Sequence, residues 1–320
     1  MTFSMTRRLA LAMVPVILAS GVAAAQDAKT LRIGYQRSST LIALLKTNGE
    51  LEKSLAPLGV SITWHEFTSG LPQLEALNTG NIDFSADVAD TVPIFAQAAG
   101  AKLAYVAEEA PSPAAQAILV PAASAIKTVA DLKGKKVAVT KGAGSHYLLV
   151  AALAKAGLSA KDITPAFLTP ADGRAAFVSK NVDAWVAWDP FLTTARHQNK
   201  AVVLADGANG LASYKRYYLA SESYAQKNGN VLKVVYDNLD KTGKWVKANP
   251  KEAGKILGEI WKIDAAIAEE SIANRSYKVG YVTRDGLSEQ KKIADAFHAE
   301  GVLPKTVDTL DVAIWQAPTN

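Results

Sequence analysis

The chain has 320 residues, which suits about two domains of ordinary size, and its 49% hydrophobic and 20% charged content excludes a disordered or collagen-like protein. It contains no cysteine, so disulfides, thiolate metal sites and cysteine nucleophiles are excluded. Its four histidines form no closely spaced pair and its net charge is only +5, so we expect no metal site and no nucleic-acid partner.

Residues 1–25 have the order of charged, apolar and small residues that is typical of a secretory signal peptide. Arg7 and Arg8 precede an apolar run over 9–19, and three alanines at 23–25 offer a cleavage site. The run is shorter than the ~20 residues of a membrane-spanning helix, which argues against an anchor. We therefore expect export to the periplasm of a Gram-negative source, with the Sec and twin-arginine routes both open.

Short β-rich runs alternate with helical patterns from Leu31 onward, which predicts an α/β fold with largely parallel sheets. The first series of predicted strands covers 31–36, 61–67, 82–85 and 102–107. The second series covers 116–120, 136–140, 163–168, 182–188 and 202–205. A strand over 217–221 and a helix-rich tail from Tyr224 complete the chain.

Two clusters of Pro, Gly, Asn and Ser, at 109–113 and 206–210, bracket the second series and predict two hinge crossings. The simplest architecture is a discontinuous lobe I, formed by 26–113 and 217–320, with lobe II, 114–216, inserted into it. A ligand would then bind in the cleft between the lobes, near the carboxyl ends of parallel strands. We expect the protein to act as a monomer.

Several helix boundaries carry recognisable signals. The segments 128–131 and 169–172 both predict capping boxes, and 249–252 repeats the pattern with Pro at the first helical position. A helix that begins near Ser145 has one apolar face and ends at Gly157.

Two strand-to-helix turns, 36–40 and 141–146, are rich in small and hydroxyl residues. Their backbone N–H groups and the positive ends of the helix dipoles favour an anion, although helix capping alone explains either turn. The Walker, dinucleotide-binding and hydrolase-elbow motifs are absent from the sequence, so we expect no nucleotide or other cofactor and no catalytic residues. Ser145 and His146 are no nucleophile–base pair, because adjacent helical residues point about 100° apart.

Trp185 and Trp188 lie three residues apart in a predicted strand and should face opposite sides of the sheet. At most one of them faces the cleft, and Trp188 is nearer the carboxyl end of the strand; burial of both rings in the core remains an alternative. Asp189, before Pro190, is first a helix cap and only second a ligand contact. Asp87, Asp90 and Thr91 form an acidic turn before a helix, and Asp90 is expected to cap that helix.

These residues resemble the periplasmic aliphatic sulfonate-binding proteins of ABC importers, and the resemblance covers nearly all of the chain beyond residue 25. The segments that carry it are 33–36, 74–83, 93–100, 128–134, 168–172, 174–177 and 188–190. The resemblance implies the type II periplasmic-binding fold and delivery of the ligand to a membrane permease driven by a cytoplasmic ATPase. Bilobal folds of this kind also include enzymes, but the chain has no cysteine to carry a cofactor and no clustered metal ligands, so we expect no enzymatic activity. Each segment also occurs in related taurine- and nitrate-type binding proteins.

The resemblance also implies a set of binding residues: Gln36, Ser38, Ser39, Asp90, Thr91, Gly142, Gly144, Ser145, His146, Trp188 and Asp189. One departure concerns 88–91, where these proteins have Thr-Gly-Asp or Thr-Gly-Glu and this chain is one residue longer. A sulfonate is permanently negative, with three acceptor oxygens and an apolar tail, so it needs N–H and O–H donors beside an apolar wall. Taurine, sulfate esters, aromatic sulfonates and a small anion such as nitrate remain alternative ligands.

Overall fold

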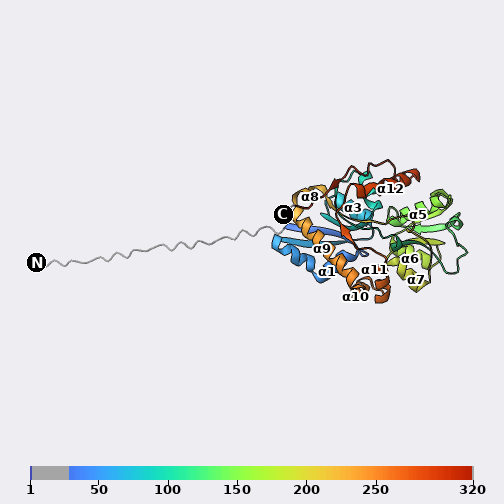
Figure 1. Ribbon diagram of the computed structural model, residues 1–320, viewed down its shortest axis with the longest axis horizontal. Helices are drawn as coiled ribbons and strands as arrows, with labels where there is room; N and C mark the ends of the chain where they lie inside the picture. The colour runs from blue at the N-terminus through green and yellow to red at the C-terminus, as the bar shows by residue number, and fades with distance from the viewer. Residues whose placement is uncertain (2–28, 319–320) are drawn as a thin grey trace.

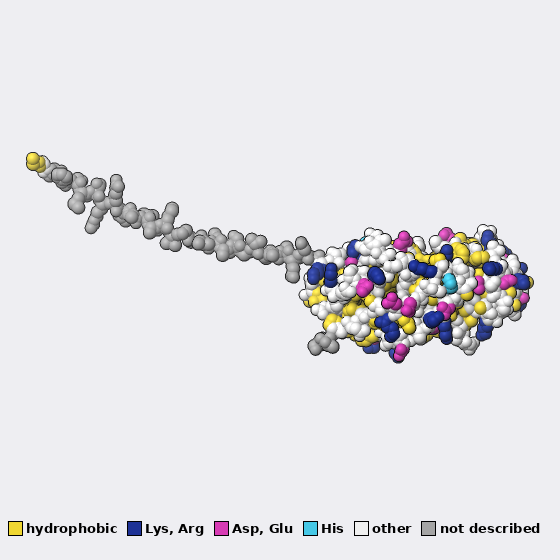
Figure 2. All heavy atoms as spheres, turned by 90° about the horizontal axis from the view of Figure 1, so that it is seen from above, with side chains coloured by type: hydrophobic (Ala, Val, Ile, Leu, Met, Phe, Trp, Pro, Cys, Tyr) yellow, Lys and Arg dark blue, Asp and Glu magenta, His cyan; other side chains and the backbone are white. Residues whose placement is uncertain are grey.

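A computed structural model describes residue 1 and residues 29–318, in which helices and strands alternate around two sheets (Figure 1). Apart from residue 1, the predicted signal peptide, 1–25, lies outside the described residues. Among the helices of 29–318, none combines the length and apolar character needed to cross a bilayer. On the face in Figure 2, Lys and Arg side chains are interspersed with Asp and Glu rather than gathered in one patch.

The first sheet has the strand order β11-β4-β10-β3-β1-β2, with β12 beside β4. Its strands are β1 (Lys29–Gln36), β2 (Val60–Phe67), β3 (Phe84–Ala89), β4 (Leu103–Glu109), β10 (Arg216–Ser221), β11 (Val279–Gly280) and β12 (Ala313–Ile314). Strand β1 is parallel to β2 and β3, whereas β10 is antiparallel to both β3 and β4. Strand β3 extends four residues beyond the predicted 82–85, so Asp87 lies inside a buried strand and not in a turn.

The second sheet has the order β7-β6-β8-β5-β9. Its strands are β5 (Gln116–Val120), β6 (Lys136–Val139), β7 (Thr164–Phe167), β8 (Ala184–Trp188) and β9 (Val202–Asp206). Strand β6 is parallel to β7 and β8, but β5 is antiparallel to β8 and β9. Both sheets are therefore mixed but largely parallel, as predicted. Strands β1, β2, β3, β4 and β12 share one direction and so do β6, β7, β8 and β9, whereas β10, β11 and β5 run the opposite way. Strands β5 and β10 each enter their sheet directly from a crossing and not from a helical crossover, and a strand's own residues do not encode its direction.

Helices cover both faces of each sheet (Figure 1). They are α1 (Thr40–Asn48), α2 (Glu50–Leu55), α3 (Gly70–Asn78), α4 (Thr91–Ala98), α5 (Gly144–Lys155), α6 (Pro170–Val178), α7 (Phe191–Asn199), α8 (Glu222–Lys227), α9 (Gly229–Ala248), α10 (Pro250–Trp261), α11 (Ala265–Ala273) and α12 (Ser288–Ala299). In the first sheet, α1 and α9 pack on one face and α3 on the other; in the second, α5 packs opposite α6 and α7.

The predicted helix signals have different outcomes. The capping box of Thr128 and Asp131 forms, but it begins a short 3₁₀ helix. Thr169 caps α6 through the Asp172 N–H, and Gly157 follows α5 with a φ of 73°. The helix start predicted at 249–252 is confirmed, since α10 begins at Pro250. The capping hydrogen bond does not form, because the Asn249 side chain donates to the Trp245 carbonyl of the preceding helix α9.

The chain passes between the sheets at 110–115 and again at 207–215. The two crossings are hydrogen-bonded to each other, because Ser112 N donates to Ser213 O at 2.9 Å and Gly207 N donates to Pro113 O at 3.1 Å. Strand β10 begins at Arg216, so this residue belongs to the first sheet. The lobe boundaries after residues 113 and 216 stay a prediction.

Candidate functional site

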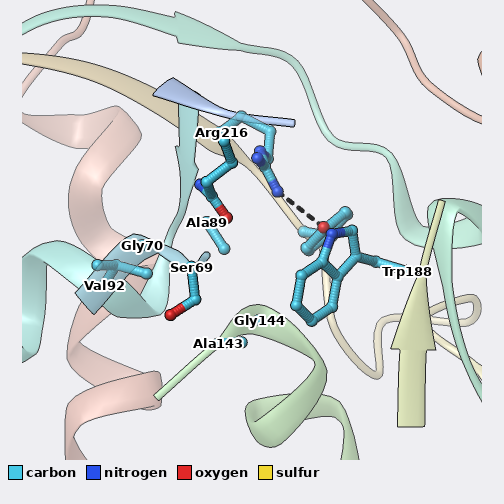
Figure 3. A pocket seen from close by; sticks show the side chains of 10 residues that line it. Ser69, Gly70, Ala89, Val92, Ala143, Gly144, Trp188 and Arg216 are labelled. Atoms are coloured by element: carbon cyan, nitrogen blue, oxygen red, sulfur yellow. Dashed lines mark hydrogen bonds between the residues drawn. The ribbon is translucent and has the colours of Figure 1, made fainter. Parts of the chain in front are cut away.

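Elements of both sheets surround a small cavity of about 10 Å³ (Figure 3). Its walls come from the ends of β1, β3 and β8, the start of β10, the first turns of α3, α4 and α5, and the second crossing. The lining residues are Gln36, Ser69, Gly70, Ala89, Val92, Ala143, Gly144, Trp188, Tyr214 and Arg216. A space of this size holds about one water molecule, so the two sheets are drawn closely together around it.

The first turn of α5 is one wall of this cavity. Gly144 permits the close approach, because a Cβ atom there would lie 2.6 Å from the Tyr214 ring and 3.1 Å from Ala89. The first N–H groups of a helix have no intrahelical partner, so those of Gly144 and Ser145 are available to a ligand. The Ser145 hydroxyl is fully buried and has no hydrogen-bond partner in residues 29–318. This turn therefore offers donors to an anion.

His146 holds the loop before α5 rather than lining the cavity. Its Nδ1 accepts a hydrogen bond from Gly142 N at 3.2 Å, and its ring packs against Phe167 and Phe297. Burial, with a smaller effect of Lys141, lowers the pKa of His146 to about 4, so the ring is neutral at pH 7. The Gly142 carbonyl accepts a hydrogen bond of 2.7 Å from Thr91 Oγ1, which ties this loop to α4.

The turn after β1 forms part of the opposite wall. Gln36 lines the cavity, and its Nε2 donates to Asp87 O at 3.3 Å. Ser39 Oγ accepts from Gln36 N at 3.2 Å, so the Ser39 hydroxyl stabilises the turn itself. Ser38 Oγ accepts from Trp188 Nε1 at 3.4 Å, which joins the first sheet to the second.

The two tryptophans face opposite sides of β8, as predicted. Trp188 lines the cavity and packs against Phe191. Trp185 packs on the other face of β8, against Phe177 and close to Gly173 of α6. The indole of Trp188 therefore supplies an apolar wall at the cavity, while Trp185 belongs to the core.

Arg216 lines the cavity and was not among the predicted binding residues. Its side chain is buried, and NH1 donates to Tyr214 Oη at 2.7 Å (Figure 3). NH2 donates to Asp87 Oδ2 at 2.9 Å. Its Nε has no partner among the described residues. The only local signal is a charge at the start of the apolar run Tyr217–Ala220, because no motif surrounds Arg216.

Asp87 links Arg216 to a second buried arginine. Asp87 Oδ2 also accepts from Arg275 NH2 at 3.0 Å, and the same nitrogen donates to Glu109 Oε2 at 2.7 Å. Glu109 Oε1 accepts from Tyr218 Oη at 2.7 Å. Two carboxylates thus balance two guanidinium groups, and removing one member of such a buried network is strongly destabilising.

The two predicted acidic site residues do not line the cavity. Asp90 caps α4, as predicted: its Oδ1 accepts from Thr91 N at 3.0 Å and its Oδ2 from Lys215 N at 3.1 Å, while burial raises its pKa to about 7. Asp189 Oδ1 accepts from the N–H and the hydroxyl of Thr193 in the first turn of α7. Its Oδ2 accepts from Asn274 Nδ2 at 2.8 Å, and burial raises the pKa of Asp189 to about 6.

Three of the predicted residues line the cavity, namely Gln36, Gly144 and Trp188. Others hold its walls through the contacts given above: Ser38, Ser39, Asp90, Thr91, Gly142, His146 and Asp189. Ser69, Gly70, Tyr214 and Arg216 are additions that only the folded chain reveals. Within 29–318, His, Asp and Glu side chains form no group of three that would hold a metal ion. The arrangement suits a small anion with an apolar part.

Comparisons with known proteins identify the family of the chain. A family described as NMT1/THI5 like matches residues 56–253. An aliphatic sulfonates-binding protein of Escherichia coli is 41% identical, over 97% of this chain and 96% of that protein. The solved alkanesulfonate-binding protein of Xanthomonas axonopodis pv. citri, bound to MOPS, is 39% identical with a TM-score of 0.85 and covers 90% of this chain and 98% of its own.

The solved periplasmic aliphatic sulphonate-binding protein of Escherichia coli is 41% identical with a TM-score of 0.80, and the match covers 90% of this chain and 98% of that one. These likenesses confirm both the predicted periplasmic-binding fold and the resemblance on which the binding residues were assigned.

Proposed function

Because this chain belongs to the NMT1/THI5-like family and, within it, to the aliphatic sulfonate-binding proteins, we propose that it captures aliphatic sulfonates for an ABC importer. It is a binding protein and not an enzyme. The site that we assign to the ligand is the cavity between the two sheets.

One observation carries the assignment of the site: a buried guanidinium, the first turn of a helix and an indole ring surround the same space. The negative headgroup would accept hydrogen bonds from Arg216 and from the N–H groups of Gly144 and Ser145. The alkyl tail would lie against Trp188, where burial of each CH₂ group contributes about 0.8 kcal/mol.

Ligand entry requires motion, because a cavity of about 10 Å³ is too small for any alkanesulfonate. We infer that lobe II, predicted as 114–216, moves relative to lobe I, 26–113 and 217–320, about the two crossings, and closes on the ligand. Arg216, in β10 of the first sheet, would stay with lobe I. Gln36, Ser38 and Ser39 would then meet the ligand from lobe I. Gly142, His146, Asp90, Thr91 and Asp189 would shape the walls.

We further propose that the protein is exported by its signal peptide, 1–25, and works as a monomer in the periplasm. Its closed form would deliver the ligand to a membrane permease that is driven by an ATPase. Taurine, sulfate esters, aromatic sulfonates and nitrate are the alternative ligands, since the departure at 88–91 adjoins the site.

Titration calorimetry of the purified protein against C2 to C8 alkanesulfonates tests this function. We expect binding of one ligand per chain, with an affinity that rises with tail length until the tail leaves the cleft. The alcohols of matched length lack the charge and serve as controls. Competition with taurine and nitrate ranks the alternatives, and no heat of binding across the whole sulfonate series would refute the ligand class.

A further inference from the structure

We call the first sheet with the helices that pack on it the first unit, and the second sheet with its helices the second unit. Asn274 connects these two units at a point outside the cavity. It follows α11 of the first unit, and its Nδ2 donates to Asp189 Oδ2 at 2.8 Å, with Thr193 Oγ1 at 3.4 Å. Asp189 and Thr193 follow β8 of the second unit. Asp189 is buried and Asn274 half-buried, so this hydrogen bond is sheltered from water. It joins parts of the chain that must separate if the cleft opens.

The next residue fixes the position of Asn274. The Arg275 guanidinium is held by Asp87 at 3.0 Å and by Glu109 at 2.7 Å, and all three side chains are buried. Asp87 also holds Arg216 at the cavity. Since Arg275 is anchored within the first unit, the neighbouring Asn274 cannot follow Asp189 when the second unit moves.

The rest of the segment is anchored as well. Ser276 N donates to Ser112 Oγ, on the first crossing, at 2.9 Å, and the Tyr277 hydroxyl lies 2.9 Å from Thr40 Oγ1 at the start of α1. Tyr277 has a φ of 51°, a left-handed conformation that is unfavourable for a residue with a Cβ atom. The Tyr277 carbonyl oxygen lies only 2.3 Å from the position that a Cβ atom on Gly243 of α9 would take. The path of 274–277 is therefore imposed by its surroundings, as expected of a functional segment.

We propose that Asn274 is a positioning residue that latches the closed form through Asp189 and thereby sets the affinity for the ligand, which it does not touch. The inference rests on the proposed function, because it concerns closure over the same site. In the open form the Asn274 amide and the Asp189 carboxylate are both hydrated. Their hydrogen bond therefore stabilises the closed form relative to the open form, and not the folded state relative to the unfolded state. Without Asn274, closure buries an Asp189 oxygen that has lost its donor, which penalises the closed form.

The first test compares Asn274→Ala with the wild type. A hydrogen bond to a buried carboxylate is lost, so we expect the Kd for an alkanesulfonate to rise about tenfold, mostly through faster dissociation. The denaturant midpoint of the ligand-free protein should change little, because only the closed fraction of the ligand-free molecules makes this contact. Asn249→Ala is the matched control, since its Nδ2 donates within its own unit, to Trp245 O at 3.0 Å; we expect its Kd to equal that of the wild type. A Kd for Asn274→Ala within twofold of the wild type overturns the latch.

A charge swap separates a latch from a local packing effect. Asn274→Asp places a second carboxylate against Asp189, so we expect weaker binding than for Asn274→Ala. In the double variant with Asp189→Asn, the side-chain amide at position 189 can donate to the carboxylate at position 274, so the hydrogen bond is restored in the opposite direction. This variant should recover at least half of the lost binding free energy. A double variant that binds no better than Asn274→Asp overturns the proposal.

Failure of the proposed function can be told apart from failure of the latch. If the wild type binds no sulfonate, the proposed function fails whatever Asn274 does. The latch is then judged by small-angle scattering of the ligand-free proteins, in which Asn274→Ala should have the larger radius of gyration. An equal radius of gyration would overturn it.

Discussion

The two sheet units contact each other along two edges of different chemistry. On one edge, α4 and α12 of the first unit meet α5 of the second through apolar side chains such as Ile94, Phe297 and Val150. On the other edge, α11 meets α7 through polar contacts. There Asn274 donates to Asp189, and Glu270 pairs with Arg196 at 2.7 Å. Figure 1 shows the two edges on opposite sides of the molecule.

The two edges contribute differently to closure of the cleft. Apolar contacts are non-directional and persist over a range of lobe positions, so the first edge contributes most of the free energy of closure. Hydrogen bonds weaken steeply with distance and angle, so the second edge favours one closed position. Variants on the two edges should therefore affect different measurements.

The largest expected effect is on the apolar edge. Phe297 is fully buried and packs against Phe95 and His146, so Phe297→Ala should lower the free energy of unfolding by about 3–5 kcal/mol in a denaturant titration. Phe167→Ala is the matched control, because that ring is 48% exposed, and its effect should stay below about 1 kcal/mol. Equal losses in the two variants would contradict a core role for this edge.

A smaller effect on the free energy of unfolding is expected at Asp90, which precedes α4 of the apolar edge. Burial, reinforced by the Glu289 carboxylate, raises its pKa from 3.8 to about 7, despite the Lys215 and Thr91 N–H groups and Arg216. Between these two pH values Asp90 is protonated in the folded state and ionised in the unfolded state. The free energy of unfolding therefore falls as the pH rises. This group contributes up to about 1.4 kcal/mol per pH unit to that decline.

Asp90→Asn removes this contribution. Urea titrations of wild type and variant at pH 4.5, 5.5, 6.5 and 7.5 measure it: the variant should lose less stability across the series. A constant offset is compatible with the prediction, because the substitution also changes the cap of α4. Parallel stability curves with the same slope would contradict a raised pKa.

The smallest effect is expected on the rim of the polar edge. Glu270 contacts Arg196 at 2.7 Å and His197 at 2.6 Å, but all three side chains are at least 36% exposed. Exposed pairs contribute little and are screened by salt, so Glu270→Gln should raise the Kd at most about fivefold, and less at 0.5 M salt. Glu50→Gln, which breaks an exposed pair with Lys53 far from either edge, is the control. A loss larger than that of Asn274→Ala would place the latch at Glu270.

Most elements could be predicted from the sequence because their signals are local. The strand at 116–120 matches β5 residue for residue, since an apolar run ends at a Pro. The end of β3 was missed because Asp87 is typical of turns, and only its partners explain a buried strand position. Those partners, Arg216 and Arg275, are 129 and 188 residues away.

The sequence alone determined where most of the helices and strands lie and to which family the chain belongs. These properties follow from periodicity, caps and motifs that extend over a few residues. The tertiary structure alone decided the reversed directions of β5 and β10, the place of Arg216 at the cavity and the contact between Asn274 and Asp189, 85 residues apart. A buried charge is stable only beside its partner, and no local pattern specifies which distant residue the fold brings there.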